Sequence, residues 1–185
     1  VQIGETGSEH YLPGSTGLVT GAGGSIGAEL CRQIASYRPG EILLLGHGEN
    51  SIYHILLELK EKFPGLPTRP LIADVRDRQR LTDLLSRHDP DVIFHTAAHT
   101  HVPIMEANVA EAVMNNVFGT CNLLQAAEDS GVPRLVFVST DKAVDPVNVM
   151  GATKRLAELL VQDAAGHTGW AYVSVRFGNV LGSRG

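Results

Sequence analysis

The chain has 185 residues, of which 43% are hydrophobic and 19% are charged, and its formal net charge is −5. This length allows one domain with a sizeable core, and the acidic balance excludes a broad basic surface for nucleic acid or anionic lipid. No apolar run approaches the roughly 18 residues of a membrane span, and no signal peptide is visible, so we expect no membrane contact within the chain. Cys31 and Cys121 lie in helix-like stretches, which indicates buried thiols of a reducing compartment and a cytoplasmic location.

Residues 1–15 are polar, without periodicity, and we interpret them as a leader or linker before one domain at 16–185. Strands are predicted at Gly17–Thr20, Ile42–Leu45, Pro70–Ala73, Val92–Thr96, Leu135–Ser139 and Tyr172–Arg176. Helices are predicted at Ile26–Ala35, Ser51–Lys62, Arg78–Arg87, Glu106–Asp129 and Gly151–Ala164. This strict alternation predicts an α/β fold, a doubly wound parallel sheet of the Rossmann type with helices on both faces.

The turn after the first predicted strand is rich in glycine and opens the first helix. Its glycines at 21, 24 and 27 would permit a tight turn, close approach of the backbone to a pyrophosphate, and close packing of helix on strand. We therefore predict dinucleotide binding here rather than a plain turn. The residues assigned to the cofactor are Gly21, Gly23, Gly24, Ser25, Ile26 and Gly27. The Gly-x-x-Gly-x-x-Gly spacing is similar to the loop of the extended short-chain dehydrogenase/reductase superfamily.

The second strand runs into Gly46, where NAD sites carry an acid that holds the adenosine ribose. A missing carboxylate removes the charge that would repel a 2′-phosphate, and His47 could bind one. The sequence therefore favours NADP slightly over NAD. Glu49 keeps NAD open because it could reach a ribose hydroxyl, although a solvated acid at a helix start explains Glu49 equally well.

Asp74 and Val75 follow the third strand. In the superfamily an Asp followed by an apolar residue contacts the adenine, so the resemblance implies this role for both residues. The alternative is that Asp74 caps the helix that begins near Asp77.

Three histidines, His95, His99 and His101, lie near the end of the fourth strand. Their spacing crosses a strand-to-loop junction and includes no Cys or paired acid, which argues against a metal site. The small residues Ala97 and Ala98 would let a cofactor approach the backbone. We therefore assign Ala97, Ala98 and His99 to cofactor binding.

The fifth strand ends in a hydroxyl, an acid and an amine, which are Thr140, Asp141 and Lys142. A helix cap with a surface ion pair would produce such a run. Adjacent Asp and Lys at the carboxyl edge of the sheet, however, fit proton transfer beside a hydride site better.

Met150 and Lys154 then share one helix face at spacing i, i+4. In the superfamily this slot is Tyr-x-x-x-Lys, whose Lys holds the nicotinamide ribose. Lys154 matches that Lys, whereas Met150 cannot move a proton.

Longer segments carry a closer resemblance. Residues 139–155 (STDKAVDPVNVMGATKR) and 176–185 (RFGNVLGSRG) resemble signature blocks of the CapD-type polysaccharide biosynthesis family, and residues 94–106 resemble an earlier block. The resemblance implies a UDP-N-acetylglucosamine 4,6-dehydratase with bound NAD(P). In that reaction hydride leaves sugar C4, the C5 proton is removed, water leaves from C6, and hydride returns to C6. Some members invert C5 and others retain it.

The resemblance also implies residue roles. Asp141 is the C6 acid, Lys142 is the C5 base, and Thr140 hydrogen-bonds near the C4 oxygen. Lys154 orients the cofactor. With Met150 in the Tyr slot, the C4 base is another group, either Asp141 or a water held by Thr140.

Contacts with the UDP-sugar substrate follow from the same blocks. The resemblance implies His101 and Asn179 as substrate contacts, with Asn179 near the diphosphate. Thr100 departs from the pattern, because the family usually has Lys there, and this puts one substrate or loop contact in doubt. The chain begins at Val1 and stops at Gly185 after a strand-and-turn pattern, so we expect a C-terminal substrate domain in a longer protein.

Three expectations concern the whole protein. The Met-x-x-x-Lys pattern resembles a membrane-anchored subgroup, which implies anchoring of the full-length protein at the inner face of the cell membrane. The helices Glu106–Asp129 and Gly151–Ala164 correspond to those that form dimers in the superfamily, so we expect a homo-oligomer. Two other functions stay open, a nucleotide-sugar 4-epimerase and a non-catalytic NAD(P)-binding module. The pair Asp141 and Lys142 favours dehydration over both.

Overall fold

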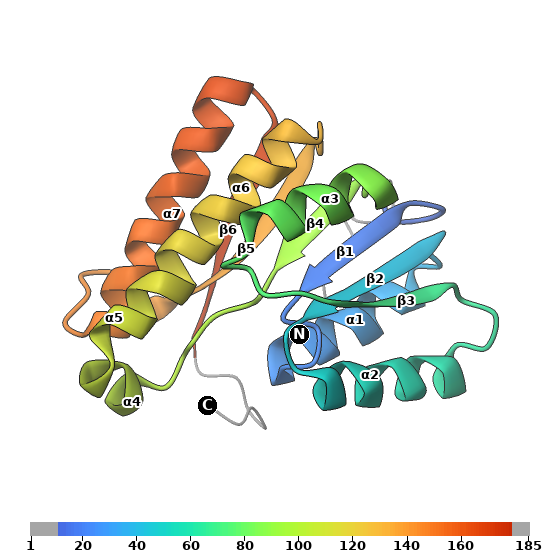
Figure 1. Cartoon of the computed structure of the whole chain (residues 1–185), viewed down its shortest axis with the longest axis horizontal. Coiled ribbons are helices and arrows are strands. Elements are labelled where there is room, and N and C mark those ends of the chain that lie inside the picture. The colour runs from blue at the N-terminus through green and yellow to red at the C-terminus, as the bar shows by residue number, and fades with distance from the viewer. Residues whose placement is uncertain (1–10, 179–185) are drawn as a thin grey trace.

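The computed structural model describes residues 11–178, which form one parallel sheet covered by helices on both faces (Figure 1). The strands are β1 (Thr16–Thr20), β2 (Glu41–Gly46), β3 (Thr68–Ile72), β4 (Val92–His95), β5 (Arg134–Thr140) and β6 (Ala171–Phe177). Their order in the sheet is β3-β2-β1-β4-β5-β6, with every pair parallel. The order reverses between β1 and β4, so the predicted doubly wound Rossmann fold is confirmed.

The helices divide between the two faces of the sheet. They are α1 (Ser25–Ser36), α2 (Glu49–Lys62), α3 (Arg78–His88), α4 (Val102–Ala107), α5 (Val109–Ala112), η2 (Val113–Phe118), α6 (Gly119–Asp129), η3 (Asp141–Ala143) and α7 (Val149–Thr168). Helices α1 and α2 lie on one face, and α3, α6 and α7 lie on the other (Figure 1). Within residues 11–178, no helix combines the length and the apolar character that crossing a bilayer requires.

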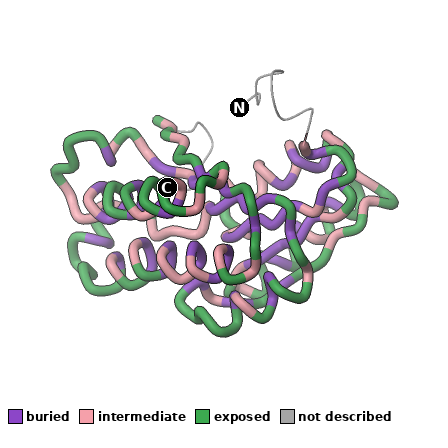
Figure 2. Tube along the Cα trace, turned by 90° about the horizontal axis from the view of Figure 1, so that it is seen from above, coloured by how far each residue is buried: buried purple, intermediate pink, exposed green. Residues whose placement is uncertain are grey.

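Side chains of β2 show how the two layers share the sheet. Leu43 and Leu45 pack into the cluster beneath α3, α6 and α7, whereas Ile42 and Leu44 pack into the cluster beneath α1 and α2. All four are at most 1% exposed. Burial on both faces explains why parallel strands are continuous apolar runs. Figure 2 shows buried positions along the strands and exposed positions on the outer sides of the helices.

The prediction of one uninterrupted helix at Glu106–Asp129 was wrong. The chain leaves helical geometry at Asn108, whose φ is −135°, and its side chain donates a hydrogen bond to the Ile104 carbonyl at 2.9 Å. Beyond α5 the segment Val113–Phe118 is a π-helix, a wider turn that often marks functional sites. Helical periodicity could not reveal the break, because the apolar spacing continues across it.

Residues 11–15, expected as the end of a leader, pack on the α1 side of the domain. Leu12 is 1% exposed within the core cluster beneath α1 and α2. Ser15 donates its hydroxyl to the Leu12 carbonyl at 2.8 Å, directly before β1. The ordered domain therefore includes these residues.

Candidate functional site

A cavity of about 680 Å³ opens at the carboxyl ends of β1, β4, β5 and β6. Its walls come from the glycine loop, the loop after β4, the end of β5 and the start of α7. The predicted site residues that line it are Gly21, Gly24, Ser25, Ile26, Gly27, Ala98, His99, His101, Thr140, Lys142 and Lys154. Ligands of open α/β sheets bind in this position.

Other predicted site residues lie outside the cavity wall. They are Gly23, His47, Glu49, Asp74, Val75, Ala97 and Asp141. His47 is exposed on the turn between β2 and α2, and Glu49 is exposed as the first residue of α2, whereas the Val75 side chain is buried. Asn179 lies outside the described residues.

The glycine loop approaches its neighbours so closely that its glycines leave no space for a side chain. Gly21 has φ +67°, a left-handed conformation that favours glycine, and a Cβ there would lie 2.8 Å from the Ala97 backbone. A Cβ on Gly27 would overlap the Gly21 carbonyl oxygen, and one on Gly23 would overlap Ser51 of α2. The loop thus packs tightly against two neighbouring segments, and a larger residue would displace it.

The start of α1 faces this cavity. Gly24 is its N-cap, and no side chain caps the helix. Backbone N–H groups in the first turn of a helix have no intrahelical partner, and together with the helix dipole they bind phosphate in dinucleotide sites. A glycine cradle at an uncapped helix start fits the pyrophosphate of NAD or NADP.

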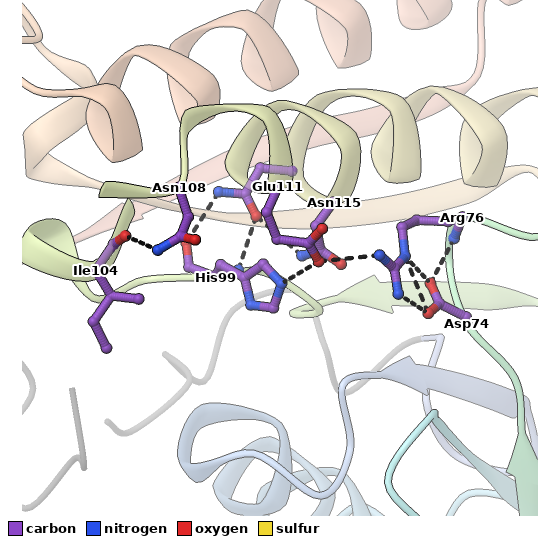
Figure 3. Close-up of polar contacts among 8 residues, drawn as sticks. Asp74, Arg76, His99, Ile104, Asn108, Glu111 and Asn115 are labelled. Atoms are coloured by element: carbon purple, nitrogen blue, oxygen red, sulfur yellow. Dashed lines mark hydrogen bonds and ion pairs between the residues drawn. The ribbon is translucent and has the colours of Figure 1, made fainter. Parts of the chain in front are cut away.

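A chain of polar contacts runs from the end of β3 to the loop after β4 (Figure 3). The Asp74 carboxylate accepts hydrogen bonds from the Arg76 backbone N–H at 2.9 Å and from Arg76 Nη2 at 2.6 Å. Arg76 Nη1 donates to Glu111 Oε1 at 3.0 Å, and His99 Nε2 lies 3.3 Å from the same oxygen. Hydrogen bonds from Arg76 hold the pKa of the Asp74 carboxyl below its usual range, so Asp74 is an ionised acceptor. The cap of α3 is Asp77 rather than Asp74.

The loop that carries His99 is held by a residue that sequence analysis missed. Asn116 of the π-helical segment accepts a hydrogen bond from the His99 backbone N–H at 2.8 Å and donates one to the His99 carbonyl at 3.0 Å. It also donates to Thr153 Oγ1 of α7 at 3.0 Å. Asn116 is 1% exposed. The buried Asn116 amide pairs with both backbone groups of His99 and so fixes the loop between β4 and α4. Only the folded structure reveals this pairing.

The last residue of β5, Thr140, and the two residues that follow it form one hydrogen-bonded group. The Thr140 hydroxyl donates to Asp141 Oδ1 at 2.9 Å, and Lys142 Nζ donates to the same oxygen at 3.3 Å. The Asp141 side chain is 57% exposed, so water screens this ion pair. The hydrogen bonds from Thr140 and then Lys142 hold the Asp141 pKa below its usual range. Asp141 is therefore a carboxylate at neutral pH.

Lys154 reaches the cavity from α7 and is only 4% exposed. Its Nζ donates to the Val138 carbonyl at 2.7 Å and lies 4.4 Å from the centre of the Phe137 ring. Burial lowers the Lys154 pKa to about 7. Met150, one turn earlier, is 3% exposed and packs with Met105 and Ala112, so it forms an apolar part of the wall.

The three histidines of the fourth-strand region separate into different environments. His95 is completely buried, with Nδ1 2.7 Å from Thr20 Oγ1 and Nε2 3.0 Å from Thr120 Oγ1. Burial lowers its pKa to about 3, so it is a neutral core residue. His99 and His101 line the cavity instead. Across residues 11–178, no group of His, Cys, Asp and Glu has the arrangement of a metal site.

The chain is similar to several known proteins over most of its length. A family profile described as "Polysaccharide biosynthesis protein" matches residues 18–185. The probable polysaccharide biosynthesis protein EpsC of Bacillus subtilis is 53% identical over 175 residues, which cover 94% of this chain and 29% of EpsC. A UDP-N-acetylglucosamine 4,6-dehydratase (inverting) of Campylobacter jejuni is 35% identical over 172 residues, which cover 91% of this chain and 50% of that enzyme.

A solved structure extends the comparison to a cofactor-bound protein. The dTDP-glucose 4,6-dehydratase DesIV of Streptomyces venezuelae, crystallised with NAD, superposes with a TM-score of 0.77 at 28% sequence identity. The match covers 87% of this chain and 55% of DesIV. The chain thus spans between about a third and about half of the length of these proteins.

Proposed function

Because the chain belongs to the polysaccharide biosynthesis protein family, we propose that it forms the cofactor-binding part of a nucleotide-sugar 4,6-dehydratase. The observation that carries the proposal is that Thr140, Lys142 and Lys154 line one cavity, while the Asp141 carboxylate outside the cavity wall accepts hydrogen bonds from Thr140 and Lys142. UDP-N-acetylglucosamine is the proposed substrate, because a relative named for that reaction is 35% identical.

The proposed cofactor is NADP or NAD, with NADP preferred. Support comes from the turn after β2, where Gly46 offers no acid and His47 is exposed. A Cβ at Gly46 would lie 3.0 Å from Ile52 Cδ1, so an acidic residue there would require the Ile52 side chain to shift. When bound, the nicotinamide would supply reversible hydride acceptance, from sugar C4 and back to C6. Lys154 would hold its ribose, and Gly21, Gly24 and Gly27 would admit its pyrophosphate.

The protein's part of the reaction is proton transfer. Asp141, a carboxylate at neutral pH, accepts the proton of the C4 hydroxyl. It thereby takes over the role of the superfamily Tyr, because Met150 occupies the position of that Tyr and cannot accept a proton. For Lys142 to accept the C5 proton, its Nζ must first release to water the proton with which it pairs with Asp141. Asp141 then donates its proton to the C6 hydroxyl, which leaves as water, and Lys142 returns a proton to C5. The sugar loses one water, and both side chains end as they began once Lys142 regains its proton from water.

The longer protein that contains this chain tests the proposal. Incubation with UDP-N-acetylglucosamine in deuterium oxide, followed by NMR, should give a 4-keto-6-deoxy sugar with deuterium at C5. The C5 stereochemistry separates inversion from retention. A C4 epimer without deuterium at C5 would identify a 4-epimerase instead, and an unchanged sugar despite bound dinucleotide would identify a non-catalytic binding module.

A further inference from the structure

A buried carboxylate lies one helical turn beyond Lys154 and takes no part in the proposed reaction. Glu158 of α7 is 5% exposed. Burying an ionised carboxylate is unfavourable unless partners compensate for the lost water. The partners of Glu158 therefore indicate what its charge is for.

Glu158 joins the helix to the ends of two strands. Its carboxylate accepts hydrogen bonds from Ser139 Oγ at 2.6 Å and from Arg176 Nε at 2.8 Å and Nη2 at 2.6 Å. Arg155 of the same helix donates a further bond at 3.0 Å. Ser139 of β5 and Arg176 of β6 are direct partners in the sheet register. One carboxylate thus clamps two neighbouring strand ends to α7.

The clamp lies directly beside the candidate catalytic group. Ser139 immediately precedes Thr140, and the preceding residue, Val138, accepts the hydrogen bond from Lys154 Nζ at 2.7 Å. Lys154 and Glu158 therefore bind consecutive residues of β5 from consecutive turns of α7. This pairing sets the position of the strand end relative to the helix that carries Lys154.

Within residues 11–178, Glu158 and His95 are the titratable groups whose electrostatics are linked to Lys154. Glu158 acts on it from its own helix, and His95 of β4 is neutral because burial lowers the His95 pKa to about 3. Burial alone favours neutral Lys154, and the Glu158 charge opposes this by raising the Lys154 pKa. Hydrogen bonds from Arg176, then from Ser139 and Arg155, in turn hold the Glu158 pKa at about 2, so Glu158 stays ionised.

We propose that Glu158 is a positioning residue that aligns the end of β5 and favours the ammonium form of Lys154, the form needed to hold the cofactor. The second half of this statement rests on the proposed role of Lys154 toward NAD(P). An ammonium group can donate three hydrogen bonds, and the carbonyl of Val138 takes one of them. Neutral Lys154 would be a weaker donor to ribose hydroxyls.

The test measures Lys154 directly, without turnover. The chain is prepared with ¹³C-labelled lysine, the Lys154 signal is assigned with Lys154→Met, and its titration midpoint is followed by NMR. Glu158→Gln should lower the midpoint by about one pH unit or more, because an opposite charge nearby typically shifts a pKa by this much. Glu158→Asp keeps the charge and should restore most of the shift. Glu128→Gln is the matched control, since Glu128 pairs with His167 on another part of the surface, and it should leave the midpoint unchanged.

A second variant covers the case in which Glu158→Gln does not fold. Arg176→Gln removes a cation beside the carboxylate, so the Lys154 midpoint should rise. An unchanged midpoint in whichever of the two variants folds overturns the inference.

Calorimetric titration with NADP and NAD then separates the two proposals. If the unmodified chain binds neither dinucleotide, the proposed function fails, whatever Lys154 does. If it binds one, Glu158→Gln should weaken binding about tenfold above neutral pH, where its Lys154 is largely neutral.

Discussion

At the scale of single residues, substitutions of Asp141 and Lys142 should impair different steps of the reaction in the longer protein. Lys142→Met removes the proposed C5 base, so solvent deuterium should no longer enter C5 when the sugar is followed by NMR. Asp141→Asn should slow turnover by about 10²–10⁴-fold, the usual contribution of an acid–base residue. It should also prevent the build-up of reduced cofactor, because the C4 proton has no acceptor.

Two outcomes would contradict these roles. Near-normal C5 exchange in Lys142→Met would place the base elsewhere. Absorbance of reduced cofactor in Asp141→Asn would make a water held by Thr140 the C4 base.

Backbone conformation at Gly21 leads to a second prediction. Its φ of +67° and the 2.8 Å approach to the Ala97 backbone leave no place for a methyl group. Gly21→Ala should cost about 1–2 kcal/mol in the free energy of unfolding and should weaken dinucleotide binding. Gly166→Ala is the control, since nothing lies within 4 Å of its Cβ position inside α7. It should stabilise the chain by about 0.5–1 kcal/mol without affecting binding, as measured by urea unfolding and calorimetry.

At the scale of elements, the start of α7 connects helix capping to the site. Asn148 caps α7 by accepting a hydrogen bond from the Gly151 N–H at 2.7 Å, and Asp77 caps α3 in the same way from Arg80 at 3.0 Å. Asn148→Ala and Asp77→Ala should each cost about 1 kcal/mol in the free energy of unfolding. Only Asn148→Ala should weaken NAD(P) binding, because α7 carries Lys154. Equal loss of binding in both variants would show that the effect is one of general stability.

At the scale of the whole molecule, one helical face carries several exposed apolar side chains. They are Val109, Met114 and Phe118 on α5 and η2, and Leu156 and Leu159 on α7, each 44–52% exposed. Self-association through this face stays a prediction. Light scattering should detect a dimer that Phe118→Lys weakens. Tyr53→Lys is the control, because Tyr53 is equally exposed at 54% on α2, across the sheet. A monomer at high concentration would contradict the prediction.

A separate prediction concerns how much the chain does by itself. The alternating strands and the glycine loop all lie within residues 11–178, so the chain should fold and bind NADP or NAD at millimolar concentration in calorimetry. It should not turn over a UDP-sugar, since it spans only about half of the Campylobacter jejuni relative. Remote substrate contacts help to orient the reacting centre. Turnover equal to that of the longer protein would contradict this.

The sequence by itself determined the fold class, the glycine loop and the family. These features depend on local chemistry: parallel strands buried on both faces are apolar throughout, and a left-handed turn at Gly21 favours glycine. The motif at Thr140, Asp141 and Lys142 could likewise be found in advance. Its three residues are contiguous in the sequence, so they lie close together in any fold.

Only the tertiary structure decided which distant residues meet. Asn116 holds His99 across 17 positions, Arg76 reaches Glu111 across 35, and Ser139 reaches Glu158 across 19. No spacing rule predicts these pairs, since they depend on how a π-helical turn and a helix dock on the sheet. The same holds for charge states, because burial, which the fold alone sets, makes His95 neutral and brings the Lys154 pKa to about 7.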